Sequence, residues 1–207
     1  MGYVQTKKRE FIFNELKTRF DKKQARQILA ESDVRYTELI REYLGKSDDE
    51  MMHIEVIVRE VAYYEALMKH MRKEDAYGVL RKITHEVCDM VAKLGSFITF
   101  FPGGSRLVVK IMSTLEKAMF GEKSGFSKEV ITDTKDEFRF KVHKCPYFDL
   151  YNKYGYPELC QLSCESDQWS YGSIKRFKMI QTSTLGFGAP CCDYTYRSSN
   201  FKDEEVK

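Results

Sequence analysis

The stretch FRFKVHKCPYFDLYNKYGYPELCQLSCESDQW, residues 138–169, contains both kinds of secondary structure from which we expect this chain to be built. Its first residues alternate between apolar and basic side chains, which is typical of a half-buried strand. A short helix is expected over 146–154, where Gly155 and Pro157 stop it, and a second helix is expected over 158–168. The stretch therefore predicts a strand followed by two short helices.

Two further strands are expected nearer the C-terminus. Residues 177–184 and 192–197 are rich in strand-forming side chains, and the glycine and proline residues between them form a turn. These two strands should pair as a hairpin. The connection over 121–136 is polar, and we expect no regular element in it. The tail over 198–207 is also polar and should fray.

The first 120 residues show the spacing of helices. Ser47 precedes three acidic residues and is a good N-terminal cap, and a later helix should end near Gly95, before the turn at 101–104. The stripe expected on the first helix consists of Phe11, Phe13, Leu16 and Phe20. The sequence therefore predicts an α+β fold, in which a helical N-terminal part packs on a small antiparallel sheet with short embedded helices. We expect a helical region (1–120), a site-bearing α+β region (121–197) and the polar tail to form one integrated domain.

Composition excludes several classes of function. The chain has 207 residues, with 34 basic and 31 acidic side chains and a formal net charge of +3. This balance argues against a nucleic-acid-binding protein, because such proteins usually carry a large basic excess. No apolar run is long enough to span a membrane, and the charged start of the chain lacks an apolar signal core. We therefore expect a cytoplasmic protein with six reduced cysteines.

Three side chains in the quoted stretch share one face of the expected helix. Cys160, Cys164 and Asp167 are spaced i, i+4 and i+7, so they should lie one above the other. Two thiols and a carboxylate in this arrangement could bind a divalent metal. They could equally form a nucleophile with a nearby base.

Two more cysteines should lie on the sheet. Cys145 ends the first strand, on the side of His143 and two other basic residues, which would lower its thiol pKa and leave it partly ionised. Cys192 begins the last strand, with Tyr194 and Tyr196 on its side and Asp193 pointing the other way. The candidate metal ligands are therefore Cys145, Cys160, Cys164 and Cys192.

A simple core role must be weighed against a site. Free cysteine is among the most buried residue types, so a cysteine in a helix or strand is commonly packing. Cys88 lies within an apolar helical pattern and is expected in the core, and Cys191 should face away from Cys192. Because the chain contains no Cys-x-x-Cys pair, a zinc ribbon is not indicated. Spacing alone leaves both interpretations of the other cysteines open.

An ordered set of short motifs carries a family resemblance. The chain resembles the L-2-amino-thiazoline-4-carboxylic acid hydrolase family in Cys145-Pro146-Tyr147, Gly155-x-Pro157-Glu158-Leu159, Cys164-x-x-Asp167, Thr184-Leu185-x-x-Gly188 and Cys192-Asp193-Tyr194. Its C-terminal part is also similar to the 4-vinyl-reductase-type small-molecule-binding domain. Two departures stand out. Gln181 occupies a position where the resemblance leads us to expect a basic residue, and Tyr194 replaces a more usual phenylalanine.

The resemblance implies a hydrolase acting on cyclic amidine-like C–N bonds, which opens a thiazoline-type ring with water to give a carbamoyl-cysteine. Cys164 would be the nucleophile or a ligand, and Asp167 the base or the residue that orients it. Cys145 and Cys192 would complete the site, and the expected substrate-binding residues are Tyr147, Glu158, Thr184 and His143. The alternatives are a non-catalytic small-molecule-binding or sensing module and a metal site formed by the cysteines. A homo-oligomer is compatible with all three.

Overall fold

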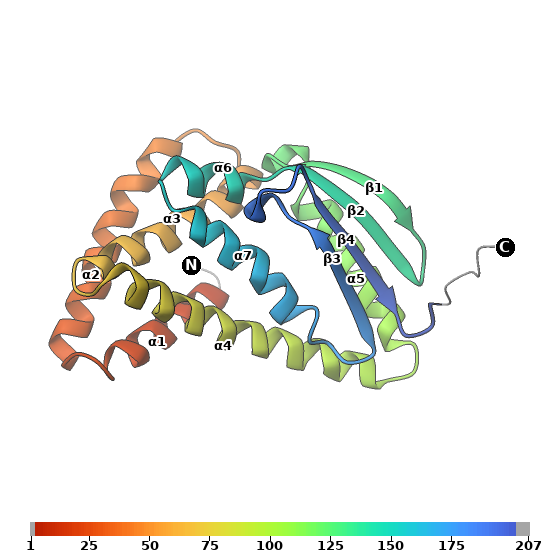
Figure 1. The fold of residues 1–207 in the computed structure, drawn as a ribbon, viewed down its shortest axis with the longest axis horizontal. Helices are drawn as coiled ribbons and strands as arrows, with labels where there is room; N and C mark the ends of the chain where they lie inside the picture. Colours follow the sequence, from red (N-terminus) through yellow and green to blue (C-terminus); the bar gives the residue numbers. More distant parts are fainter. Residues whose placement is uncertain (1–2, 202–207) are drawn as a thin grey trace.

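The computed structural model describes residues 3–201, in which seven α-helices pack with one four-stranded antiparallel sheet (Figure 1). The first five helices are α1 (Tyr3–Leu16), α2 (Lys22–Ile40), α3 (Asp48–Met68), α4 (Lys73–Phe100) and α5 (Gly104–Met119). They are followed by β1 (Ser127–Asp133), β2 (Glu137–Lys144), α6 (Pro146–Lys153), α7 (Pro157–Ser170), β3 (Phe177–Ser183) and β4 (Cys192–Ser198). Three short 3-10 turns are η1 (Arg41–Tyr43), η2 (Glu122–Ser124) and η3 (Leu185–Phe187). The expected α+β class is confirmed.

The start of α3 follows from local side-chain chemistry. The Ser47 hydroxyl accepts a hydrogen bond from the Glu50 backbone N–H at 3.3 Å, and the Glu50 carboxylate accepts one from the Ser47 N–H at 3.2 Å. These reciprocal bonds satisfy two N–H groups that would otherwise lack partners at the helix end. The cap predicted at Ser47 is confirmed.

The sheet has the strand order β1-β2-β4-β3, so the hairpin predicted between β3 and β4 is confirmed. Strands β2 and β4 pair directly, with Phe140 opposite Tyr194. On this inner face of the sheet, the side chains of Phe138, Phe140, Cys192, Tyr194 and Tyr196 are all buried. The alternation read from the sequence therefore correctly identifies the face that carries Cys192.

Strand β1 corrects the expectation that residues 121–136 lack a regular element. It pairs with β2 along most of its length, but it lies at the edge of the sheet and most of its side chains are exposed. Even its apolar residues Val130 and Ile131 are more than 40% exposed. An edge strand of this kind lacks an alternating buried face, so its sequence carries no strand pattern.

Helix α4 continues past Gly95 to Phe100, which corrects the helix end predicted from that glycine. Gly95 is buried inside the helix because the side chain of Ile174 packs against it. A β-carbon at this position would lie 2.5 Å from the Ile174 Cδ1 atom. Here the glycine permits a close approach between two chain segments and does not terminate the helix.

The apolar stripe expected on α1 is only partly right. Ile12 and Leu16 are fully buried, whereas Phe11 and Phe13 are half-buried and Phe20 follows the helix. The burial of Ile12 follows from its position one turn before Leu16 on the same face.

Two hydrophobic clusters divide the interior. One joins the helices α1–α4, α6 and α7, and the other joins the inner face of the sheet to α5. Tyr147 at the start of α6 contacts both clusters. Among residues 3–201, no helix combines the length and hydropathy needed to cross a bilayer. The boundary between the two clusters is the region that the candidate site occupies.

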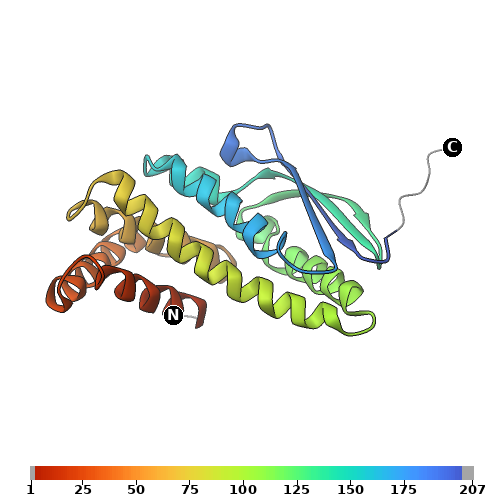
Figure 2. The same cartoon turned by 60° about the horizontal axis from the view of Figure 1, so that its bottom comes forward.

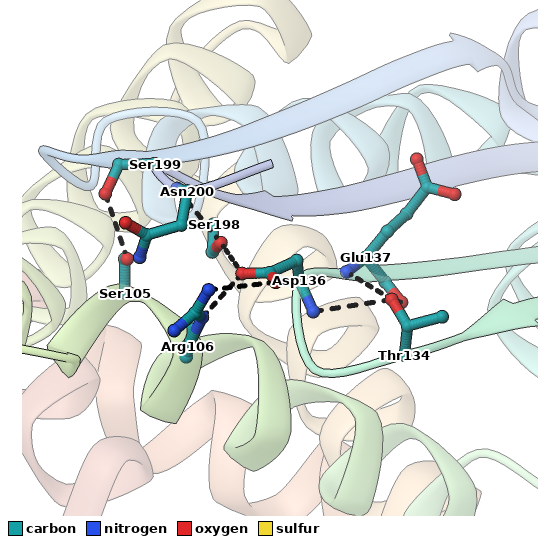
Figure 3. A network of polar contacts seen from close by, with 8 residues as sticks. All are labelled: Ser105, Arg106, Thr134, Asp136, Glu137, Ser198, Ser199 and Asn200. Carbon is teal, nitrogen blue, oxygen red and sulfur yellow. Dashed lines mark hydrogen bonds and ion pairs between the residues drawn. The ribbon is translucent and has the colours of Figure 1, made fainter. Parts of the chain in front are cut away.

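A polar network fixes one end of the sheet and extends the ordered fold beyond Arg197 (Figure 3). Arg106 of α5 binds both carboxylate oxygens of Asp136 at 2.7 and 3.2 Å, and Ser198 donates to Asp136 at 2.5 Å. The hydroxyls of Ser105 and Ser199 are 3.0 Å apart. Ser198 is therefore the last residue of β4 and not the start of a frayed tail, while 202–207 lie outside the described residues.

The two glycines of α4 allow a matched stability test. We expect Gly95→Ala to lower the free energy of unfolding by about 1–2 kcal/mol, because overpacking against Ile174 outweighs the gain in helix propensity. In contrast, Gly78→Ala should raise it by about 0.5–1 kcal/mol, since Gly78 is exposed and a β-carbon there meets no atom within 4 Å. Urea titration followed by circular dichroism measures both. Equal effects of the two substitutions would contradict this account of Gly95.

Candidate functional site

A cavity of about 390 Å³ lies between the two hydrophobic clusters. Helix α7 forms one wall, and the inner face of β2 and β4 forms another. Helices α1, α3, α4 and α5 each contribute side chains to the remainder. The lining combines aromatic rings with thiols, carboxyl groups and hydroxyls, which is the mixture expected of a pocket for a small ligand.

The face of α7 predicted from sequence spacing lines this cavity. Cys160, Cys164 and Asp167 all contribute to the lining. Leu159, Cys160 and Leu162 are almost completely buried in the helical cluster, and Leu162 also contributes to the cavity lining. Helix α7 is therefore anchored in the helical cluster while its i, i+4, i+7 face, with two thiols and a carboxyl group, borders the cavity.

The sheet cluster supplies two further thiols. Cys145, at the N-cap of α6, and Cys192, at the start of β4, also line the cavity. All six cysteines of the chain are free thiols. Cys191 does not line the cavity, as the sequence predicts, whereas Cys88 is both buried and part of the lining. Four candidate cysteines from two distant segments therefore converge on one space.

The expected ionisation of Cys145 is wrong. Its thiol is surrounded by protein atoms, and this burial raises its pKa to about 12, although the backbone N–H groups of Phe148 and Tyr147 act in the opposite direction. Burial also raises the pKa of Cys192 to about 11, despite a hydrogen bond of 3.3 Å from the Leu185 N–H to its sulfur. Both thiols are therefore neutral at physiological pH, because desolvation outweighs local hydrogen bonding.

Cys164 has the opposite character. A hydrogen bond from the Cys160 thiol, supported by the Thr184 hydroxyl and the Gly186 backbone N–H, lowers the pKa of Cys164 to about 7. As the donor in this pair, Cys160 has its own pKa raised. Three donors converge on Cys164, so it is the thiol of the pair that ionises. A substantial fraction of Cys164 is consequently thiolate near neutral pH.

The turn η3 reaches Cys164 only because residue 186 is glycine. A β-carbon on Gly186 would lie 2.9 Å from the Cys164 sulfur and 3.1 Å from the Cys160 sulfur, closer than side-chain carbons normally approach sulfur. The absence of a side chain lets the backbone N–H approach the thiolate directly. Sequence reasoning assigned this glycine only to the turn between two strands and gave it no part in the site.

Asp167 is enclosed by protein except where it lines the cavity. Burial raises its pKa to about 8, and the nearby negative charge of Cys164 acts in the same direction. The Tyr194 hydroxyl donates to the Asp167 carboxyl at 2.9 Å and partly opposes this shift. Gln181 in turn donates from its side-chain amide to the Tyr194 oxygen at 3.0 Å. At neutral pH the cavity therefore contains a largely protonated carboxyl group beside an ionisable thiol.

Two ion pairs supply the remaining charges near the cavity. The Lys8 ammonium of α1 lies 2.6 Å from a Glu60 oxygen, and Tyr151 donates to the other Glu60 oxygen at 2.9 Å. Lys8 and Glu60 both line the cavity. Elsewhere on the wall, Glu116 pairs with the buried Lys128 at 2.5 Å. Lys8 is the only basic residue in the lining formed by the described residues.

The four expected substrate-binding residues are placed differently by the fold. Tyr147 lines the cavity, and Thr184 is buried with its hydroxyl near the Cys164 thiol, where that hydroxyl has no partner within hydrogen-bond distance among residues 3–201. In contrast, Glu158 lies at the far end of α7, where it accepts a hydrogen bond from Tyr64 and pairs with Lys73. His143 is exposed on the sheet and lies 3.2 Å from Glu129. The fold thus brings two of the four residues to the site.

The thiols are not arranged as a multidentate metal centre. Within the part of the chain that the structure describes, no group of three or more His, Cys, Asp or Glu side chains has the geometry to bind a metal ion. A metal site built from the four cysteines has no geometric support.

Lys8, Glu60 and Glu116 are cavity residues that the sequence analysis missed. Each lies in a helix far along the chain from α7, and Lys8 occurs in a run of charged residues typical of a solvated surface. Because helix spacing reports only neighbours on the same element, it gives no signal of this long-range assembly. The side-chain burial of Lys8 and Glu60, only 13% and 8% exposed, becomes evident only in the folded chain.

Comparison with known proteins identifies the same family that the sequence motifs resemble. Neither the curated proteins nor the solved structures included a match to this chain. A profile of one protein family matches residues 49–196, which extend from the first turn of α3 into β4 and include every cavity cysteine. This match covers most of the chain, and it establishes that the chain belongs to the L-2-amino-thiazoline-4-carboxylic acid hydrolase family.

Proposed function

We propose that the chain is a hydrolase that opens a small cyclic amidine of the 2-amino-thiazoline-4-carboxylate type, with Cys164 as the nucleophile and Asp167 as the proton-transfer group. The observation that carries the proposal is the juxtaposition of an ionisable thiol and a protonated carboxyl group in one enclosed cavity. Opposite pKa shifts in neighbouring groups are typical of an acid–base pair in an active site. The family membership favours this substrate class.

The reacting carbon of such a substrate suits a thiolate. The ring carbon lies between nitrogen, sulfur and an exocyclic amino group, so it is electrophilic, most strongly when the amidine is protonated. Attack by the Cys164 sulfur forms a carbon–sulfur bond, and the π electrons of the C=N bond move to the ring nitrogen. Asp167 donates a proton to this nitrogen and becomes a carboxylate. The result is a tetrahedral adduct on Cys164.

Collapse of this adduct should break the ring carbon–sulfur bond, because a thiolate is a better leaving group than an amide anion. The released ring sulfur takes a proton and becomes a free thiol, while the carbon remains attached to Cys164 as an isothiourea. Water then adds to that carbon and gives up a proton to the Asp167 carboxylate. Expulsion of the Cys164 thiolate leaves a carbamoyl group on the substrate nitrogen. The sum is one substrate and one water converted to one N-carbamoyl-cysteine.

Lys8 is our candidate for binding the substrate carboxylate. It is the basic side chain among the described lining residues, and this side chain is 13% exposed. Gln181, at the position where we expected a basic residue, is neutral and donates instead to Tyr194. Lys8 lies outside the segment matched by the family profile. Its partner Glu60 stabilises the ammonium before the substrate binds.

The first prediction concerns the nucleophile. Purified, reduced protein should convert L-2-amino-thiazoline-4-carboxylate to N-carbamoyl-cysteine, detected by chromatography with mass spectrometry. Cys164→Ser should lose at least about 100-fold in kcat, because a serine hydroxyl lacks an accessible ionised form here. The matched control Cys191→Ser should retain full activity, since Cys191 lies outside the cavity lining. Equal activity of the wild type and Cys164→Ser would disprove the assignment. Stabilisation by the substrate without product would favour the binding-module alternative.

The second prediction concerns pH. The value of kcat/KM should rise as Cys164 loses its proton near pH 7 and fall as Asp167 loses its proton near pH 8, giving a narrow bell-shaped profile. Asp167→Asn should lower kcat by about 100-fold or more and remove the alkaline limb.

A pair of Cys160 variants tests the acidic limb separately. In Cys160→Ala the largest cause of the lowered Cys164 pKa is lost, so this limb should move to higher pH. Cys160→Ser keeps a hydrogen-bond donor at this position, so the acidic limb should stay at the pH at which the wild type shows it. A profile unchanged in both Cys160→Ala and Asp167→Asn would refute these roles. Initial rates measured across the pH range, with folding checked by circular dichroism, provide the data.

The third prediction separates carboxylate binding from catalysis. We expect Lys8→Met to raise KM at least about 10-fold for the carboxylate substrate, with little change in kcat. For 2-amino-thiazoline, which lacks the carboxylate, the variant and the wild type should have the same KM. Because Lys8→Met leaves Glu60 without its ion-pair partner, the double variant Lys8→Met with Glu60→Gln serves as the folding control. Equal losses with both substrates would argue against carboxylate recognition by Lys8.

A further inference from the structure

The hairpin of α4 and α5 carries an exposed apolar surface that lies apart from the cavity. The two helices are joined by the turn around Gly103, from which α5 runs back toward the sheet at an angle to α4 (Figure 1, Figure 2). Eight large apolar side chains of this hairpin are between 37% and 70% exposed. We call this set the hairpin face; its members are Met90, Leu94, Phe97, Phe100, Phe101, Leu107, Ile111 and Leu115.

The spacing of these residues makes the hairpin face continuous. On α4, Met90, Leu94, Phe97 and Phe101 recur at intervals of four, three and four residues, so they form one stripe. The rings of Phe97 and Phe101 contact each other, with their centres 5.3 Å apart. On α5, the stripe formed by the last three members of the set begins one turn after Gly104, the residue that packs against the Ile98 backbone of α4. Because Gly104 is on the same side of α5 as Leu107, Ile111 and Leu115, the α5 stripe lies on the side of that helix that approaches α4 at the turn.

Both helices are apolar on two sides. Val108, Val109 and Met112 on the inner side of α5 are buried against the sheet, while its outer side carries the exposed stripe. A helix that is apolar around most of its circumference is normally buried on all of those sides. Other exposed large apolar residues, such as Val34 and Leu44, are scattered singly over the described surface and need no such explanation.

We infer that the hairpin face is the interface of a homodimer, in which two α4–α5 hairpins pack against each other as a four-helix bundle. The exposed apolar area of the hairpin face is large enough for an interface with a second copy of the chain. Side chains of this size present roughly 150–250 Å² each, so the observed exposures amount to roughly 800 Å² of apolar surface. A standard stable interface buries about 800 Å² on each partner. Antiparallel helical hairpins also have the shape from which such bundles form.

The charges at the rim favour a second copy over an anionic lipid surface. Along α4 the hairpin face is flanked by the acidic residues Glu86 and Asp89 as well as by Lys93. Lys110 flanks it on α5, and at the turn end the Arg176 guanidinium lies 5.8 Å from the centre of the Phe100 ring. A rim with both signs of charge can meet opposite charges on an identical partner. Attraction to an anionic bilayer would require a uniformly basic rim.

Sedimentation velocity of the full chain tests this inference. We expect a mass of twice the chain in a dilution series that begins at micromolar concentration. Leu94→Glu should weaken the dimer at least about 30-fold, because it would bury an unpaired carboxylate in the middle of the contact. The matched control is Leu44→Glu, an exposed leucine on the far part of the helical region, which should leave the dimer intact. Circular dichroism checks that both variants remain folded.

Three results would overturn the inference. One is a wild-type chain that stays monomeric throughout the series. Another is a monomer that binds vesicles of phosphatidylcholine and phosphatidylglycerol and loses this binding on Leu94→Glu, which would assign the hairpin face to a membrane surface. A dimer that both glutamate variants leave intact would place the interface elsewhere. Amide hydrogen exchange provides a second readout, because dimer formation should protect the backbone of 90–101 and 107–115.

Discussion

The position of α7 between the two hydrophobic clusters is the constraint on which the candidate site depends. Leu159, Cys160 and Leu162 anchor the helix in the helical cluster, while Cys160, Cys164 and Asp167 line the cavity whose other wall is the sheet. The turn η3 then closes over Cys160 and Cys164, at a distance that only glycine at position 186 permits. A change that rotated α7 would thus remove the reactive side chains from the cavity and break the contacts of η3 at once.

Local sequence patterns predicted the parts of this arrangement that depend on neighbouring residues. The i, i+4, i+7 spacing placed Cys160, Cys164 and Asp167 on one helix face, and the period-two pattern identified the inner face of β4. Both predictions succeeded because helices and strands impose their periodicity whatever surrounds them. Edge strand β1 escaped detection since its pairing partner, and not its own pattern, makes it a strand.

The ionisation of the cysteines depends on the whole fold, so local sequence patterns could not predict it. The basic neighbours of Cys145 in the sequence suggested an ionised thiol, but its surroundings in space are protein atoms that raise its pKa to about 12. Cys164 lacks basic neighbours on its own helix, yet the Cys160 thiol one turn earlier and the donor groups of residues 184–186 lower its pKa to about 7. Ionisation follows solvation and hydrogen bonding in three dimensions, and the charges of sequence neighbours report neither.

The charge balance inside the cavity also bears on the kind of ligand it can accept. The pairs of Lys8 with Glu60 and of Lys128 with Glu116 are each neutral overall, and Asp167 is largely protonated near pH 7. The ionised form of Cys164 is then the one uncompensated charge among the described lining groups. An apolar cavity containing a single anion favours a cation, and a protonated cyclic amidine is such a cation. Binding of that cation would stabilise the thiolate, so the substrate itself would promote formation of the reactive state of the thiol that attacks it.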